Sequence, residues 1–272
     1  MPGQARAGDL HAMRTMPIPL LEGIVYGPVR SRRLGRSLGV NVLPRALKVC
    51  NMDCAYCQYG WTRDRPASRK RGQAKWPAPE RVEGAVAARL RQAAATGELI
   101  DRLTVAGHGE PTLHPEFEEI AERLCRLRDR IAPDIRLAIL SNSTTAAREE
   151  IRRALALFDE RYMKLDAGDP MTYATVNGAG SFSDVLDALR NLPQVVVQAM
   201  FVADGTGEVD NTTEHTLAGW LSAIDTIQPA RVQVYTIARP PALGGLKRVP
   251  ARRLREIAER VRALGVPADV FN

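Results

Sequence analysis

The pattern of apolar and polar positions divides the chain into short and long segments that alternate. Short runs rich in apolar and β-branched residues predict buried strands. Longer segments, in which apolar residues recur every three or four positions, predict amphipathic helices. The predicted strands cover 37–43, 101–107, 135–141, 161–167, 194–202 and 230–237. The predicted helices cover 79–97, 115–131, 145–158, 181–192, 211–227 and 249–265.

About six strand–helix units in succession predict an α/β fold with a parallel sheet covered by helices and right-handed crossovers. A curved six-stranded partial barrel and an open doubly wound sheet both fit this order. In either architecture ligands bind at the carboxyl ends of the strands. Residues 1–20 show no period, and we expect them to form a poorly ordered tail before one domain over 21–272.

Composition narrows the class of protein. The chain has 272 residues and is 45% hydrophobic, which is enough for one large core. No apolar run approaches the roughly 18 residues of a membrane span, and the N-terminus lacks the apolar segment of a secretion signal. We therefore expect a cytoplasmic protein that does not enter a membrane. The lone Cys125 is predicted to be a small buried hydrophobe in a helix.

Net charge is a weaker indicator of the protein's partners than the strand and helix pattern is of its fold. The formal net charge is +7, which favours anionic partners such as RNA or nucleotides. Arginine is nevertheless scattered over most predicted helices, and dispersed charge is a weak sign of nucleic-acid binding. Arg30, Arg32, Arg33 and Arg36 precede the first predicted strand. They could bind phosphates, or they could pair with acidic helices and cover the floor of the barrel, and both readings stay open.

Three of the four cysteines lie within eight positions. Cys50, Cys54 and Cys57 follow the first predicted strand with the spacing C-x3-C-x2-C. A secreted disulfide scaffold would spread more cysteines along a shorter chain. A zinc site normally takes four ligands, often in pairs, and there is no second cysteine pair here. Thiolates also hold cubane iron–sulfur clusters, usually four per cluster, so three would leave one iron open to a ligand.

Polar residues follow the next strands at the same edge of the sheet. Gly107 and Gly109 allow a ligand to approach the backbone closely, and Glu110 adds an acid at the mouth. Ser141 and Asn142 end the third strand, where ribose hydroxyls would need partners. Capping of the next helix by serine or threonine is a competing explanation for this segment.

Later strands add four more candidates. Lys164 and Asp166 project from the same side of the fourth strand, and buried charges must pair, so we expect a contact between them or with substrate. Gln198 lies among apolar residues, and a buried amide needs partners, which favours a ligand-facing position. Arg239 precedes two prolines at the mouth and could clamp a carboxylate or phosphate.

The cysteine loop, with Tyr56 before its last cysteine, resembles the radical S-adenosylmethionine (SAM) superfamily. The resemblance implies a partial (β/α)6 TIM-like barrel and one [4Fe-4S] cluster on Cys50, Cys54 and Cys57, which would be both metal ligands and catalytic residues. Its open iron would chelate SAM. Reductive cleavage would give a 5′-deoxyadenosyl radical that abstracts hydrogen from an unknown substrate.

The same resemblance assigns roles to the strand ends. Tyr56 would line the adenine side, and the segment from Gly107 to Glu110 resembles a GGE motif that binds the SAM amino group, with His108 inserted. Ser141 and Asn142 would contact the SAM ribose or carboxylate. Asp166, Gln198 and Arg239 are expected to complete the cofactor-binding set.

Over roughly residues 22–245 the chain resembles small Fe–S oxidoreductases related to wyosine-base synthases. Those synthases carry a second cluster on additional N-terminal cysteines, which this chain lacks, so one cluster is expected. The implied partners are an external one-electron reductant such as flavodoxin or ferredoxin and an unknown, possibly anionic substrate. Two alternatives stay open: an RNA- or tRNA-binding or tRNA-modifying Fe–S protein, and an enzyme that activates a glycyl-radical partner.

Overall fold

The structure, a computed structural model, describes residues 18–62, 75–178 and 180–272. A nine-stranded sheet curves into a partial barrel, with β2 to β7 and β9 parallel and β1 antiparallel to β2. The small strand β8 pairs antiparallel with β6. The strands are β1 (Val25–Ser31), β2 (Gly35–Val40), β3 (Arg102–Val105), β4 (Arg136–Ser141), β5 (Glu160–Lys164), β6 (Val195–Ala203), β7 (Arg231–Thr236), β8 (Lys247–Arg248) and β9 (Ala268–Phe271).

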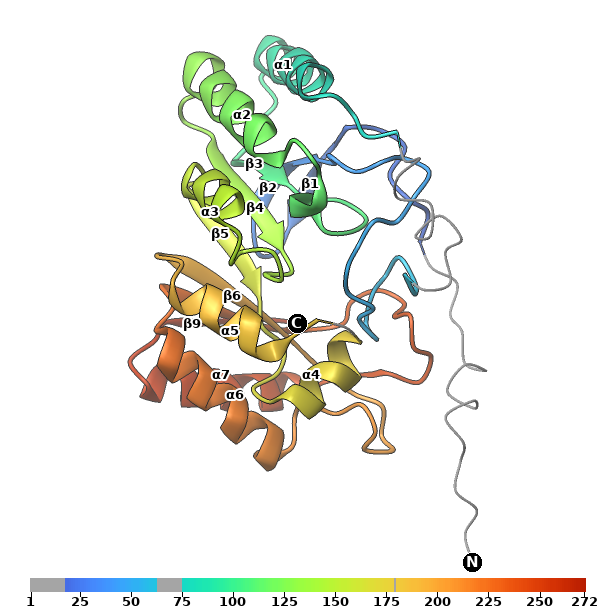
Figure 1. The fold of residues 1–272 in the computed structure, drawn as a ribbon, viewed down its shortest axis with the longest axis vertical. Helices are drawn as coiled ribbons and strands as arrows, with labels where there is room; N and C mark the ends of the chain where they lie inside the picture. Colours follow the sequence, from blue (N-terminus) through green and yellow to red (C-terminus); the bar gives the residue numbers. More distant parts are fainter. Residues whose placement is uncertain (1–17, 63–74, 179) are drawn as a thin grey trace, which may run out of the picture.

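Helices form a layer on the outer face of this sheet, and α4 lies apart from that layer (Figure 1). Their bounds are α1 (Pro79–Thr96), η3 (Pro111–Leu113), α2 (Phe117–Ile131), α3 (Glu149–Ala156), α4 (Pro170–Asn177), α5 (Phe182–Arg190), α6 (Glu214–Ile227) and α7 (Ala251–Ala263). Pro79 opens α1 and Gly97 closes it in the left-handed conformation, as the sequence indicated.

Successive side chains of each strand point alternately to the outer face of the sheet and to the interior of the barrel. The outer face is apolar, and the interior is more polar. Leu103, Leu137 and Val197 are fully buried in the core cluster that the outer helices share. Inside the barrel, Lys164, Gln198 and Gln233 align in register across β5, β6 and β7. The expected partial barrel is confirmed. Polar side chains line its interior, because the outer face of the sheet is packed against the apolar faces of the helices.

Three strands were not predicted, and one of them is the two-residue strand β8. β1 contains Gly27, Pro28 and Arg30, which weaken any strand signal, and within the described residues it is an edge strand paired with β2. β9 has only four residues and pairs with β7. The sheet therefore has an extra parallel strand and an antiparallel edge beyond the six predicted strands.

Two helix predictions need correction. The predicted helix 145–158 is too long, because α3 begins at Glu149 and its N-cap Arg148 makes no side-chain capping bond. Capping of that helix by Thr144 or Thr145 is therefore wrong. The predicted helix 115–131 begins instead at Phe117, after the short turn η3. The helix α4 was missed, since it is short and rich in threonine and asparagine.

The hairpin of β1 and β2 closes the floor of the barrel, the end where the parallel strands begin. Its turn sends Leu34 into a buried cluster with Ala138 and Tyr162. The Arg33 guanidinium carbon lies 4.1 Å from the centroid of the Tyr235 ring, across the barrel. Part of the arginine-rich segment thus covers the barrel floor, one of the two readings of its sequence.

Most of the expected N-terminal tail, and residues 63–74 of the segment after the cysteines, lie outside the described residues. Within the described part, the backbone N–H of Ile18 donates to the carbonyl of Gln58 at 3.0 Å. The domain boundary at residue 21 stays a prediction. No helix in the described ranges is long and apolar enough to span a membrane.

Candidate active site

The cysteine loop crosses the mouth of the barrel and is fastened from two sides. On one side the N–H of Glu110 donates to the carbonyl of Val49 at 2.9 Å. A Cβ on Gly109 would lie 1.9 Å from that carbonyl oxygen, so this glycine is required by the approach of the cysteine loop itself. The glycine motif therefore holds protein backbone here, whatever ligand it also meets.

On the other side the loop rests on the end of α4. The N–H groups of Asp53 and Ala55 each donate at 2.9 Å, to the carbonyls of Asn177 and Val176. Two backbone bonds from alternate residues form a short ladder between segments more than 100 residues apart. The position of Cys54, between Asp53 and Ala55, is thus fixed by α4.

The three thiols are half-buried on this loop. Burial raises the pKa of Cys50 to about 12 and that of Cys54 to about 11, and neighbouring cysteines add to both shifts. Such thiols ionise at neutral pH only when a metal replaces the proton. In the described part of the chain, no three His, Cys, Asp or Glu side chains are placed to hold a single metal ion.

Two side-chain amides point their N–H groups at the cysteine sulfurs. Asn142 Nδ2 lies 3.7 Å from the sulfur of Cys50, and Asn177 Nδ2 lies 3.5 Å from the sulfur of Cys54. Amide donors stabilise negative charge on thiolates and on the clusters that thiolates hold. Three thiols on one loop, two of them with amide donors, are a donor set that fits an iron–sulfur cluster.

Glu110 lies at the centre of a buried network behind the loop. Its Oε1 accepts from the Thr112 N–H, the Thr112 hydroxyl and Ser141 Oγ, and its Oε2 accepts from the N–H of Asn142 at 2.6 Å. Burial raises the pKa of this carboxyl, although these hydrogen bonds oppose the shift. Among the described residues Oε2 has this one donor, so it keeps a lone pair for a further donor such as an amino group.

A second network lines the barrel beside Cys54. Lys164 Nζ lies 2.7 Å from Asp166 Oδ1 and donates to the Tyr235 hydroxyl at 2.9 Å. Tyr56 and Asn177 both donate to the other oxygen of Asp166. Burial lowers the pKa of Lys164, but Asp166 and Tyr235 outweigh that effect and the pKa is raised, so the ammonium stays charged. The expected Lys164–Asp166 contact is confirmed.

The remaining candidates lie at the same end or deeper in the barrel. Gln198 donates to Gln233 Oε1 at 2.8 Å, so one end of its buried amide has a protein partner. Arg239 is exposed at the mouth and donates to Gln58 of the cysteine loop. Gly107 packs against the Asn41 side chain. Cys125, expected to be buried, is only half-buried and packs against the edge of the core.

Sequence reasoning missed two residues of this site. Asn177 ends the unpredicted helix α4, and only tertiary contact brings it to Cys54. Lys48 is 1% exposed, its ammonium donates to the Gly60 carbonyl, and its charge favours the thiolate form of Cys50. A lysine between apolar residues two positions before a cysteine was the available signal for it.

The comparisons with known proteins agree with this geometry. The model of the radical SAM superfamily matches residues 47–218, which include all three clustered cysteines, Glu110 and Asp166. The chain belongs to the radical SAM superfamily. The resemblance drawn from the cysteine loop is therefore confirmed at superfamily level, as is the expectation that the protein is an enzyme.

Among curated proteins, this radical SAM chain is 37% identical over 154 residues to a UPF0026 protein of Methanocaldococcus jannaschii. The match covers 57% of this chain and spans less than half, 44%, of the relative. The expected link to wyosine-base synthases is not tested by this match and stays a prediction.

Solved structures share the fold at low sequence identity. A radical SAM methyltransferase from Sphaerobacter thermophilus aligns with a TM-score of 0.58 and 16% identity, covering 86% of this chain and 65% of that one. SuiB of Streptococcus suis bound to S-adenosylmethionine aligns with a TM-score of 0.61 and 13% identity, covering 86% and 50%. These likenesses confirm the partial-barrel fold.

Proposed function

We propose that this radical SAM enzyme holds one [4Fe-4S] cluster on Cys50, Cys54 and Cys57 and uses it on SAM bound across the mouth of the barrel. When bound, the cluster supplies the electron that cleaves SAM to methionine and a 5′-deoxyadenosyl radical, which abstracts hydrogen from a substrate. The observation that carries the proposal is the loop itself. Three thiols lie at the mouth of a partial barrel, and amides face two of their sulfurs.

Residues around the cysteine loop would then bind the cluster, SAM and the substrate. Asn142 and Asn177 hold the sulfurs of Cys50 and Cys54 through their amides. Glu110 offers the free lone pair of Oε2 to the amino group of SAM. Asp166 keeps Lys164 charged and buried inside the barrel, where the ammonium faces the space that a substrate would enter.

The test is anaerobic reconstitution followed by chemical reduction in the presence of SAM. The wild type is expected to bind about four irons per chain and to release 5′-deoxyadenosine, and Cys54→Ala should do neither. Cys125→Ala is the matched control, because Cys125 lies on α2, away from the loop, and should leave both readouts unchanged. An intact cluster that yields no 5′-deoxyadenosine would overturn the proposal.

An external one-electron donor, such as a flavodoxin or ferredoxin, would supply the electron in the cell. Replacing the chemical reductant with a reduced flavodoxin tests this part separately. RNA is a second candidate substrate. The exposed arginines Arg30 and Arg32 do not form a described ion pair, whereas Arg36 is paired with Asp101.

A further inference from the structure

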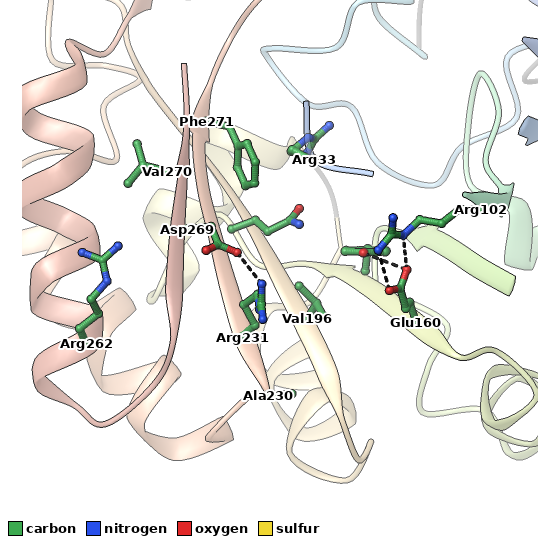
Figure 2. Close-up of a pocket in the computed structure, with 12 residues that line it drawn as sticks. Arg33, Arg102, Glu160, Val196, Ala230, Arg231, Arg262, Asp269, Val270 and Phe271 are labelled. Carbon is green, nitrogen blue, oxygen red and sulfur yellow. Dashed lines mark hydrogen bonds and ion pairs between the residues drawn. The ribbon is translucent and has the colours of Figure 1, made fainter. Parts of the chain in front are cut away.

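The floor of the barrel contains a cavity of about 700 Å³, at the opposite end from the cysteine loop. It is bounded by the starts of β5, β6 and β7, by β9, and by Arg33 from the turn of the β1–β2 hairpin (Figure 2). Pockets of roughly 300–1,000 Å³ are typical of small-molecule sites. The cavity is therefore large enough for a ligand that does not pass through the barrel mouth.

The charged groups around this cavity are mostly neutralised by one another. Arg102 forms two hydrogen bonds to Glu160, at 2.5 and 2.9 Å, and Arg231 pairs with Asp269 at 2.9 Å. Arg262, on α7, is held by Glu259 at 2.6 Å. These three guanidinium groups already have carboxylate partners.

Arg33 is different. Within the described residues it forms no ion pair, and its Nη1 is buried without a hydrogen-bond partner. The guanidinium is held in place by stacking on Tyr235 rather than by an acceptor. Its Nη1 is a buried donor without an acceptor, and an anion in the cavity would supply that acceptor.

Gln233, on β7, supplies a second unused donor to the same cavity. Its Oε1 accepts from Gln198 at 2.8 Å, while in the described part of the chain its Nε2 donates to no group. The Gln233 side chain is 3% exposed and lines the cavity. Arg33 in the hairpin turn and Gln233 on β7 each present a donor without an acceptor to one cavity, and together these donors would complement an oxyanion.

We propose that the floor cavity binds a small oxyanion, a carboxylate or a phosphate, through the guanidinium of Arg33 and the amide of Gln233. The site is distinct from the cluster and does not depend on the proposed function. The ligand would also be linked indirectly to the polar network beside Cys54, because Arg33 stacks on Tyr235, whose hydroxyl accepts from Lys164.

The test is calorimetric titration of the whole chain with inorganic phosphate and, separately, with succinate, in low salt. Arg33→Met retains the apolar stem and removes the donors. Arg32→Met, in the same turn, removes an exposed arginine and is the matched control. Loss of charge-assisted hydrogen bonds worth about 1.5–3 kcal/mol predicts that Arg33→Met binds at least about tenfold more weakly, with Arg32→Met unchanged.

Comparing the two anions shows whether the site prefers a tetrahedral phosphate or a planar carboxylate. Wild-type protein that binds neither anion up to about 10 mM, or Arg33→Met that binds as wild type does, would overturn the proposal. If Arg33→Met does not fold, Arg33→Lys takes its place. The lysine keeps the charge but loses the planar fork, so weaker binding supports the site and unchanged binding contradicts it.

Discussion

At the scale of single residues, the groups that act on the cysteines come from distant parts of the chain. Asn177 is 123 positions from Cys54, and its amide lies 3.5 Å from the Cys54 sulfur and 2.9 Å from Asp166. Its Oδ1 is buried without a partner in the described residues. This side chain is thus a positioning residue that links the cysteine loop to the charged pair in the barrel.

Replacing Asn177 with leucine should lower the reduction potential of the assembled cluster. Without the amide donor, the additional negative charge of the reduced cluster is less stabilised, and the shift should be on the order of tens of millivolts. Electron paramagnetic resonance during a redox titration measures it. Met171→Leu on the same helix, at a position 79% exposed, is the control and should match wild type. Equal potentials for all three proteins would show that the amide does not act on the cluster.

Replacing Lys48 is expected to change the reduction potential of the cluster without lowering the stability of the fold. Its ammonium is buried and, among the described groups, has the Gly60 carbonyl as its only hydrogen-bond partner. Lys48→Met removes a buried charge, so cluster-free protein should unfold at an equal or higher urea concentration. The assembled cluster should become harder to reduce, because a nearby positive charge is lost. A large loss of stability without a change in potential would contradict this role.

At the scale of elements, the loop after β5 and the helix α6 touch through their backbones. A Cβ on Gly168 would lie 2.0 Å from the backbone of Gly219 and Trp220. The indole of Trp220 donates to the Leu165 carbonyl at 3.0 Å and fixes the same contact. The loop after β5, which carries Asp166, is therefore positioned by α6.

Gly168→Ala should destabilise the protein by about 3 kcal/mol or more, since neither backbone can yield. Gly219→Ala places its Cβ 3.4 Å from the Gly168 carbonyl, an ordinary contact, and alanine is the better helix former. It should be neutral or slightly stabilising. Urea unfolding of both variants checks the pair, and similar losses in both would show that the close approach is not the cause.

At the scale of the whole molecule, the cysteine loop joins parts of the barrel that the sheet does not connect directly. It contacts the end of α4 through Asp53 and Ala55, and residue 18 through Gln58. Assembly of a cluster on this loop should therefore stabilise α4 as well as the loop.

Hydrogen exchange followed by mass spectrometry tests this coupling. Cluster assembly should slow exchange in residues 50–58 and 170–178 by about tenfold or more, while α2, on the outer layer, stays unchanged. The Cys54→Ala protein treated in the same way provides the baseline. Protection confined to 50–58, with α4 unaffected, would show that the two segments are not coupled.

The sequence alone determined the alternation of strands and helices and the cysteine spacing, because both are local patterns. Periodicity predicted the parallel sheet, and Cys50, Cys54 and Cys57 with the later strand ends indicated the superfamily, since parallel strands bring those ends to one edge. It also indicated that Lys164 and Asp166 contact each other or the substrate, because residues two apart on an extended segment project to the same side, and the structure shows the contact between them.

Only the tertiary structure decided what meets across the barrel. The approach of Asn177 to Cys54, the acceptor role of Glu110 and the stacking of Arg33 on Tyr235 join segments that no local pattern relates. Strand β1 and helix α4 could not be predicted from the sequence for the same reason. Their own residues give weak signals, and pairing with β2 and with the cysteine loop supplies their stability.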